Sequence, residues 1–196
     1  MSEIKSGYTR VSQILNVIPK LVSREPERFD FPIQQIDKEI LEAKKDLGTN
    51  VHAAIHEHTK GGFYPLNSQE QKYFDSYLKW AEAVKLKPIE TELRLYLDAM
   101  MITGGIDMLA QMGDSQEWQL IDFKCTAQED PDKWPIQGCF YSLILAQNGF
   151  PLFQKPIFVR LDRDGGFPSI YEYHMGRSVN DAMVSAYNLY KYLTRK

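Results

Sequence analysis

The sequence is poor in cysteine and has no long hydrophobic run. Only two of its 196 residues are cysteines, Cys125 and Cys139, which excludes a disulfide framework and a four-cysteine metal or iron–sulfur cluster. No stretch approaches the roughly 20 apolar residues of a membrane-spanning helix, and the first residues begin no apolar run typical of a secretory signal. We therefore expect a soluble, cytoplasmic protein with reduced thiols.

Positive charge is not in surplus either. The 23 lysines and arginines are outnumbered by 26 acidic residues, which gives a formal net charge of -3. This balance argues against a protein that binds nucleic acid through charge alone, but not against a metal-dependent enzyme, because bound cations offset site carboxylates. Basic residues of the N-terminal quarter would suit a DNA path, although a solvated helical face is the simpler interpretation. They are Lys5, Arg10, Lys20, Arg24, Arg28, Lys44 and Lys45.

The sequence does contain a regular succession of helical and strand patterns. Helices are expected over residues 9–15, 33–47, 48–60, 67–85, 133–147 and 179–194, with an irregular connection over 21–32. Strands are expected over residues 89–97, 157–161 and 170–174, and in a hairpin within 104–124. This order predicts an α/β fold with a mixed central sheet flanked by helices. We expect a single domain over residues 1–196, with an N-terminal helical part reaching about residue 86.

The hairpin is the stretch around which the chain is organised. Two alternating apolar runs flank a turn at Gly113-Asp114-Ser115. Folding the chain between Asp114 and Ser115 places Asp107 opposite Asp122. Directly opposed residues share a sheet face with Cβ atoms about 4.5–5.5 Å apart. Two carboxylates that close repel each other unless a proton or a cation lies between them.

Lys124 shares that face, and Gly105 across the hairpin would leave room for its ammonium. Two carboxylates and a lysine outline a site for Mg²⁺ or Mn²⁺, with the carbonyl of Phe123 as a further ligand. An ammonium beside the metal would orient an attacking water, a combination suited to phosphodiester hydrolysis. The simpler alternative is a pair of exposed strand aspartates with Lys124 in an ordinary salt bridge.

Other polar residues give weaker signals. His52 and His56 are spaced to share a helix face and would permit a zinc pair, but no His-Glu-x-x-His order supports a zinc protease. Gln137 and Tyr141 lie one helical turn apart, although a helical tyrosine is usually a core residue. Glu92 could reach the site from the neighbouring strand, although a solvated glutamate is the simpler interpretation.

Four motifs in order resemble the RecB-like branch of the PD-(D/E)XK nuclease superfamily, which includes phage and recombination exonucleases and the mitochondrial genome maintenance exonuclease. The motifs are Gly48-Thr49-Asn50-Val51-His52, Gly104-Gly105-Ile106-Asp107, Ile121-Asp122-Phe123-Lys124 and Gln137-Gly138-Cys139-Phe140-Tyr141. The resemblance implies a restriction-endonuclease-like core. It also implies that Asp107 and Asp122 bind the metal and that Lys124 is the catalytic lysine. It places His52 near or on the metal.

In the same family pattern, Gln137 and Tyr141 help to position the active site or the DNA. The chain lacks the four cysteines of the relatives that carry an iron–sulfur cluster, and it lacks the helicase domains of recombination nucleases. The resemblance therefore implies a stand-alone, phage-derived nuclease, with any helicase or recombination partner in a separate chain.

The sequence as a whole predicts a Mg²⁺- or Mn²⁺-dependent deoxyribonuclease that acts as an exonuclease on DNA ends or single strands. Aromatic side chains near the site could stack on unpaired bases. They are Tyr64, Trp134 and Tyr141. Two alternatives remain open: an idle DNA- or protein-binding module of the same fold, and a nuclease with endonuclease action or an RNA substrate.

Overall fold

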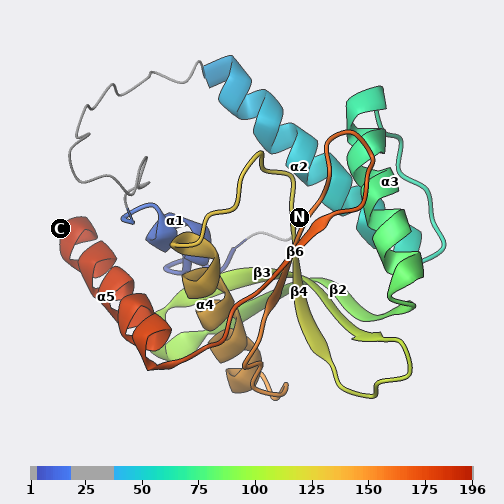
Figure 1. Ribbon diagram of the computed structural model, residues 1–196. Coiled ribbons are helices and arrows are strands. Elements are labelled where there is room, and N and C mark those ends of the chain that lie inside the picture. Colours follow the sequence, from blue (N-terminus) through green and yellow to red (C-terminus); the bar gives the residue numbers. More distant parts are fainter. Residues whose placement is uncertain (1–3, 19–37, 196) are drawn as a thin grey trace, which may run out of the picture.

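A mixed sheet of six strands forms the centre of the computed structural model, which describes residues 4–18 and 38–195 (Figure 1). The strands are β1 (Thr9–Arg10), β2 (Leu86–Leu97), β3 (Ile102–Met112), β4 (Gln119–Lys124), β5 (Ile157–Arg160) and β6 (Ser169–Glu172). Their order is β1-β3-β4-β5-β6, and β2 pairs with β3. The β1–β3 and β4–β5 pairs are parallel, and the other pairs are antiparallel.

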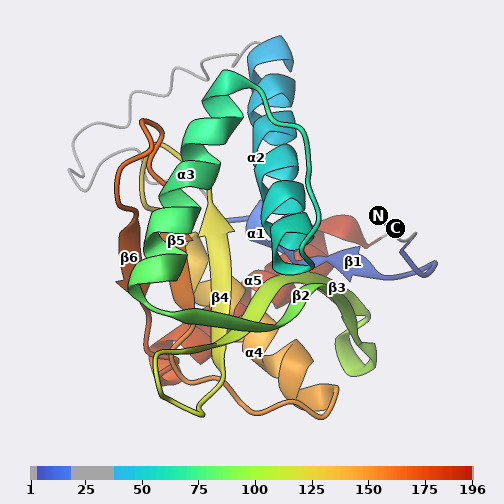
Figure 2. The same ribbon diagram turned by 90° about the vertical axis from the view of Figure 1, so that its right-hand side faces the viewer.

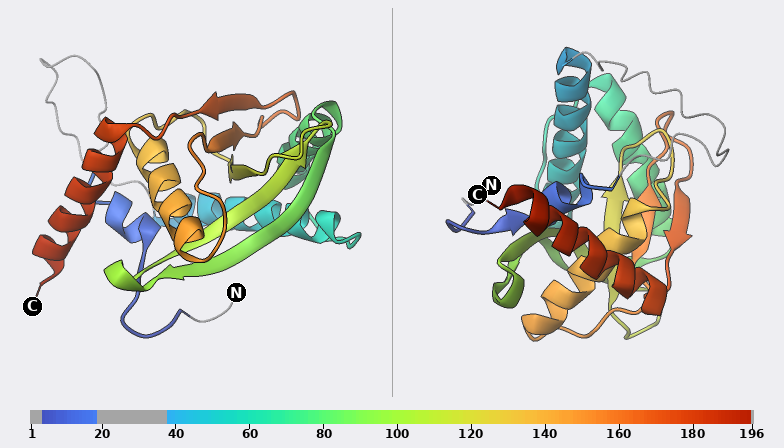
Figure 3. Two further views of the ribbon diagram at one scale, coloured as in Figure 1. Left: turned by 90° about the horizontal axis from the view of Figure 1, so that it is seen from below. Right: turned by 90° about the vertical axis from the view of Figure 1, so that its left-hand side faces the viewer.

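Helices cover both faces of this sheet. They are α1 (Val11–Leu15), α2 (Lys38–Thr59), α3 (Ser68–Ala83), α4 (Lys133–Gln147) and α5 (Arg177–Thr194), with a short 3-10 turn η1 (Asp98–Met100). Figures 2 and 3 show α2 beside α3 on one face and α4 beside α5 on the other. This arrangement confirms the predicted mixed sheet flanked by helices.

Each face has its own apolar core. The core under α1, α4 and α5 contains Ile14, Ile106, Leu120, Phe140 and Leu145. The core under α2 and α3 contains Val51, Tyr77, Trp80, Ile121 and Phe123. The alternation of Leu120, Ile121 and Asp122 along β4 therefore sends neighbouring side chains to opposite faces. Each large apolar side chain buried this way stabilises the fold by about 1.5–3 kcal/mol.

Helix α2 corrects one prediction, because it runs through Gly48 without a break. Gly48 has an ordinary negative φ and no atom near the position of a Cβ, so it costs only about 1 kcal/mol relative to alanine. Thr49 does not begin a new helix, since its hydroxyl donates to the carbonyl of Lys45 one turn earlier (3.0 Å). The predicted connection over residues 21–32, and the first residues of the helix predicted from 33, lie outside the described residues.

Two element boundaries also differ from the predictions. The first helix is capped by Arg10 rather than by Thr9, because Thr9 belongs to β1 and pairs with Ile102. Strand β2 begins before Pro88, which a bulge next to Glu90 accommodates. Proline is tolerated there because it can sit at a bulge and lacks only the N–H of the ladder.

The predicted start of α3 is confirmed. The side chain of Asn67 accepts hydrogen bonds from the backbone N–H groups of Gln69 (2.9 Å) and Glu70 (3.0 Å). The carboxylate of Glu70 accepts in return from the N–H of Asn67 (2.9 Å). This capping box satisfies N–H groups that the first helical turn leaves without partners. Among the described helices, none is both long and apolar enough to cross a membrane.

The hairpin register is confirmed, but the hairpin opens just before the two aspartates. β3 and β4 pair at Met108–Ile121, Leu109–Leu120 and Ala110–Gln119, and the ladder ends there. On their other edges, β4 pairs with β5 and β3 pairs with β2. The expected pairing of Gly105 with Lys124 is wrong, because the N–H and the carbonyl of Phe123 bond the side chains of Asp107 and His52 instead of the backbone of β3. We refer to the opening between β3 and β4 as the fork.

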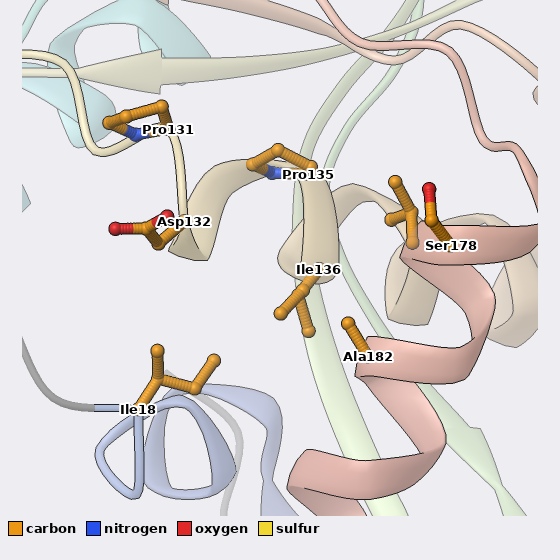
Figure 4. A pocket seen from close by; sticks show the side chains of 8 residues that line it. Ile18, Pro131, Asp132, Pro135, Ile136, Ser178 and Ala182 are labelled. Atoms are coloured by element: carbon orange, nitrogen blue, oxygen red, sulfur yellow. The ribbon is translucent and has the colours of Figure 1, made fainter.

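A surface hollow of about 440 Å³ lies between α4, α5 and the end of α1 (Figure 4). Its lining is largely apolar. It consists of Ile18, Pro131, Asp132, Pro135, Ile136, Ser178, Val179 and Ala182. None of the candidate site residues predicted from the sequence lines it.

Candidate active site

Three potential metal ligands from three different elements meet at the fork. His52 comes from α2, Glu92 from β2 and Asp107 from β3, and one ligand atom of each lies within 4.8 Å of the others. The Nδ1 atom of His52 is 3.3 Å from Oδ1 of Asp107 and 3.9 Å from Oε1 of Glu92. We call these three residues the acidic cluster. Glu92, undecided from the sequence, therefore lies beside two of the predicted ligands.

Glu92 reaches this position through an unusual backbone conformation. Its φ of 53° lies in the left-handed region, where a residue with a Cβ costs on the order of 1–3 kcal/mol. The neighbouring residues Thr91 and Leu93 remain paired with Met108 and Ile106 of β3. The regular pairing on both sides therefore holds Glu92 in a strained conformation at the point where β3 provides Asp107.

The backbone of Phe123 connects the acidic cluster to β4. Its N–H donates to Oδ2 of Asp107 (2.8 Å), and its carbonyl accepts from Nε2 of His52 (3.1 Å). Because both nitrogens of His52 face acceptors, the imidazolium form is favoured. Burial alone would lower the pKa of His52, but the charge and hydrogen bond of Asp107, with smaller effects of Asp122 and Glu92, raise it to about 9.

The other predicted residues form a second group on β4 and α4, which we call the lysine network. The ammonium of Lys124 lies 2.5 Å from Oδ2 of Asp122 and donates to Oε1 of Gln137 (2.9 Å). The Gln137 amide donates to Oδ1 of Asp122 (2.9 Å) and to the hydroxyl oxygen of Tyr141 (2.9 Å). The four candidate residues on these two elements are thus connected in one network, with Tyr141 joined through Gln137.

The two aspartates have opposite electrostatic character. Burial and the charge of Asp107 raise the pKa of Asp122 to about 6, although Lys124 opposes the rise. Burial would also raise the pKa of Asp107, but the positive charge of His52 and the hydrogen bonds from His52 and Phe123 lower it. Asp107 is therefore ionised throughout the neutral range, whereas Asp122 takes up a proton as the pH falls to about 6.

The donor set suits a divalent cation. Carboxylate oxygens and an imidazole nitrogen are ligands of Mg²⁺ or Mn²⁺ sites. The Oδ2 atom of Asp122 is buried and has no partner of hydrogen-bond geometry in the described part of the chain, despite the nearby ammonium. The carboxylates of Glu92 and Asp107, which lie within 4.8 Å of each other, also require a positive charge near them. Asp122 is not within the acidic cluster, so a shared ion between Asp107 and Asp122 stays a prediction.

Some possibilities that the sequence left open for surrounding residues do not hold in the structure. His56 does not face the cluster: its Nδ1 bonds Thr91 (2.6 Å) and its Nε2 bonds Lys60 (2.8 Å), which rules out a zinc pair with His52 in this arrangement. Trp134 is buried against Phe158, and Tyr141 is buried as well, so neither ring is free to stack on bases. Their burial reflects their core positions on α4.

Arg94 is a residue of the site that sequence reasoning missed. It lies on β2 two residues after Glu92, opposite Gly105, and its guanidinium occupies the space that Gly105 leaves. This is the space that we expected Lys124 to use. The spacing of Glu92 and Arg94 on one strand was the available signal, because residues two apart normally share a face.

Comparison with known proteins gives one family. A family model described as the PD-(D/E)XK nuclease superfamily matches residues 66–166, which include the fork, β4 and α4 but not His52. No curated protein matches the chain.

Similar solved structures include three with low sequence identity. The structure of SSO0001 has 13% identity and a TM-score of 0.45, covering 100% of this chain and 80% of that one. LHK-Exo in complex with dAMP has 16% identity and a TM-score of 0.44, covering 95% and 87%. The alkaline exonuclease LHK-Exo from Laribacter hongkongensis has 15% identity and a TM-score of 0.33, covering 96% and 92%. Similarities of this size carry no functional argument.

Proposed function

The chain belongs to the PD-(D/E)XK nuclease superfamily, and from this premise we propose that it is a metal-dependent deoxyribonuclease that acts as an exonuclease on DNA ends or single strands. One observation carries the proposal: at the fork, the acidic cluster and the lysine network lie side by side, joined by the backbone of Phe123. Apart from Glu92, the residues of both groups belong to the family motifs identified in the sequence.

We assign the metal to Asp107, Asp122 and His52, with Glu92 as a further ligand. When bound, Mg²⁺ or Mn²⁺ would neutralise phosphate charge and make a water molecule more acidic. His52 must give up the proton on Nδ1, the nitrogen that faces Asp107 and Glu92, before its imidazole can serve as a ligand. Its Nε2–H can keep its hydrogen bond to the Phe123 carbonyl, which would also orient the ring. That carbonyl has a second lone pair with which to serve as the further oxygen ligand that the sequence predicts.

Lys124 is assigned the catalytic role in the lysine network. Its ammonium is held by Asp122 and Gln137, so it is fixed in orientation and adds positive charge where the phosphate becomes more negative in the transition state. It can also orient the attacking water or stabilise its deprotonated form. Gln137 positions both the lysine and Asp122, and Tyr141 in turn holds the Gln137 amide.

The test is a digest of end-labelled linear DNA beside a closed circular DNA of the same sequence. We expect Mg²⁺ or Mn²⁺ to support release of nucleotides from the linear DNA, EDTA to abolish it, and the circle to survive. Cleavage of the circle would instead assign endonuclease action. Full activity in EDTA together with full activity of Asp122→Ala would overturn the proposed mechanism. A single-stranded RNA of the same sequence serves as the test of substrate class.

A further inference from the structure

The guanidinium of Arg94 lies flat over the backbone of β3 beside the acidic cluster. A Cβ added to Gly105 would be 3.2 Å from Nη2 of Arg94 and 3.3 Å from both Cζ and Nη1. Nearly equal distances to three guanidinium atoms mean that the planar group faces Gly105. A Cβ at position 105 would require the guanidinium to move by a few tenths of an ångström, so the glycine allows this close approach.

Arg94 is not engaged by the protein. Within residues 4–18 and 38–195, it forms no ion pair and donates no side-chain hydrogen bond, although its side chain is half-buried. A guanidinium offers five N–H donors in a fixed plane. By contrast, Arg160 donates to the carbonyl of Ala127 and to Ser169, and Lys124 is held by two partners. A half-buried arginine without partners has donors available for a ligand.

The position of Arg94 is central to the site. Burial and the charge of Asp107 raise the pKa of Glu92, whereas the charges of His52 and Arg94 oppose that rise. Burial raises the pKa of Tyr141 as well, and Arg94 again acts against it. The guanidinium charge therefore reaches both the acidic cluster and the lysine network. A ligand on Arg94 would lie next to the fork.

The chemistry of the ligand follows from these surroundings. Glu92, Asp107 and Asp122 would repel an anion, so a DNA strand entering the fork needs positive charge that is not already used. Guanidinium groups bind phosphate oxygens through two parallel hydrogen bonds, which also fixes orientation. We propose that Arg94 binds an internal phosphate of the DNA strand, next to the phosphate that is cleaved. The proposal rests on the function proposed above and adds the residue that sets the strand's position.

The first experiment measures binding of a labelled single-stranded oligonucleotide by fluorescence anisotropy in Ca²⁺, at several salt concentrations. We expect Arg94→Gln to weaken binding by about tenfold, the effect of losing a charged hydrogen-bonded pair. The slope of log K against log salt should fall by about 0.7, which corresponds to one lost phosphate contact on a single strand. Arg94→Lys should keep the slope but recover only part of the affinity, because it lacks the planar pair of donors.

Lys87→Gln is the matched control. It removes one positive charge from the same strand, seven residues or roughly 23 Å from Arg94, where the ammonium donates to the carbonyl of Gly113 (2.7 Å). Its DNA affinity and salt slope should remain near those of the unmodified protein. Gly105→Ala provides a second variant that changes no charge: the new methyl group moves the guanidinium by a few tenths of an ångström and should weaken binding in the same direction, but by less than Arg94→Gln.

A second experiment identifies the phosphate. Neutral methylphosphonates are introduced one at a time, and oligonucleotides with a 5′-phosphate are compared with those carrying a 5′-hydroxyl. One internal methylphosphonate should reduce the affinity of the unmodified protein and leave that of Arg94→Gln unchanged. Coupling of Arg94 to the terminal phosphate alone would overturn the assignment to an internal phosphate, and so would an Arg94→Gln variant that binds every oligonucleotide normally.

Calorimetry with Mn²⁺ separates this inference from the proposed function. Arg94 lies outside the acidic cluster, so Arg94→Gln should bind Mn²⁺ no more weakly than the unmodified protein. If the unmodified protein neither binds Mn²⁺ nor degrades DNA, the proposed function fails. If it does both while Arg94→Gln and Gly105→Ala keep normal DNA binding, only the role of Arg94 is overturned. Thermal unfolding of each variant identifies any loss that comes from misfolding.

Discussion

The acidic cluster and the lysine network hold the same kind of residue in different ways. In the acidic cluster, Asp107 faces His52 and the backbone N–H of Phe123. Burial would raise the pKa of Asp107, but these partners lower it by more, so the net shift is downward. In the lysine network, Asp122 is more deeply buried and its pKa is raised to about 6, despite its contact with Lys124. The comparison shows that two aspartates brought together by one hairpin acquire separate properties from their partners.

This difference suggests a division of labour. Glu92 in the acidic cluster is partly open to solvent and strained in its backbone, as expected for ligands that must rearrange around an ion. The lysine network is enclosed and internally hydrogen-bonded, as expected for groups that must keep a fixed orientation. Substitution of Asp107 should therefore act on metal binding and substitution of Lys124 on turnover, whereas Asp122, a proposed ligand within the lysine network, takes part in both.

The largest effect is expected from Asp107→Ala, in the acidic cluster. This substitution removes the carboxylate that contacts both His52 and the Phe123 N–H. We expect calorimetry to detect no Mn²⁺ binding and the DNA digest to detect no activity, because the site loses the carboxylate that lies against both His52 and the backbone of Phe123. Mn²⁺ binding at the normal affinity would show that the ion belongs to other residues.

Lys124→Ala tests the lysine network. We expect turnover to fall by about 10²–10³, the usual cost of removing one group that stabilises transition-state charge. Mn²⁺ binding should persist, because Lys124 is not a ligand. The informative measurement is the pair of values obtained from calorimetry and from the digest on the same preparation. Full activity in this variant would leave the lysine without a catalytic role, and a parallel loss of metal binding would contradict the division of labour.

These two groups also mark how far the sequence could predict the site. The turn at Gly113 and the alternation of apolar residues sufficed for the hairpin register, since a one-residue shift of either strand would turn its side chains, such as Ile121 or Met108, to the opposite face of the sheet and out of the core under α2 and α3. Gln137 and Tyr141 were predictable because a helix from Lys133 to Gln147 places them on one face. In both cases the information is local in the sequence.

The parts that failed depend on contacts distant in the chain. The fork arises because the N–H and the carbonyl of Phe123 bond the side chains of Asp107 and His52, and nothing near Phe123 in the sequence signals those partners. The left-handed conformation of Glu92 is imposed by its pairing with β3, so no local preference reveals it. A glycine such as Gly48 is typical of a helix end. Helix α2 nevertheless continues through it, because the apolar residues Val51 and Ile55 that follow pack into the core. Arg94 was overlooked because its significance depends on Gly105.

A smaller effect is expected from pH acting on the acidic cluster. The pKa of His52 is raised from 6.5 to about 9, so its protonated form stabilises the fold fully below pH 6.5, and this contribution is lost as the pH rises through 9. Metal binding requires the neutral imidazole, so Mn²⁺ affinity should increase from pH 6.5 to 9.

The control for this prediction is His52→Gln, which has no proton to release. We expect its Mn²⁺ affinity to be lower overall and to depend less on pH between 6.5 and 9. Thermal unfolding of His52→Gln should no longer show the decrease in stability that we expect for the unmodified protein as the pH rises from 6.5 to 9. An equally steep increase of Mn²⁺ affinity in His52→Gln would assign the pH dependence to another group.

The smallest effect is expected from Gly48→Ala, which lies in α2 one turn before His52 and touches neither group. Its φ is ordinary and a methyl group there would meet no atom within 4 Å, so the substitution should increase the free energy of unfolding by about 0.5–1 kcal/mol. Denaturant unfolding measures this gain, and the digest should show unchanged activity. If activity falls while stability rises, α2 must bend at Gly48 for His52 to reach the ion, and the acidic cluster depends on motion of its supporting helix as well as on its ligands.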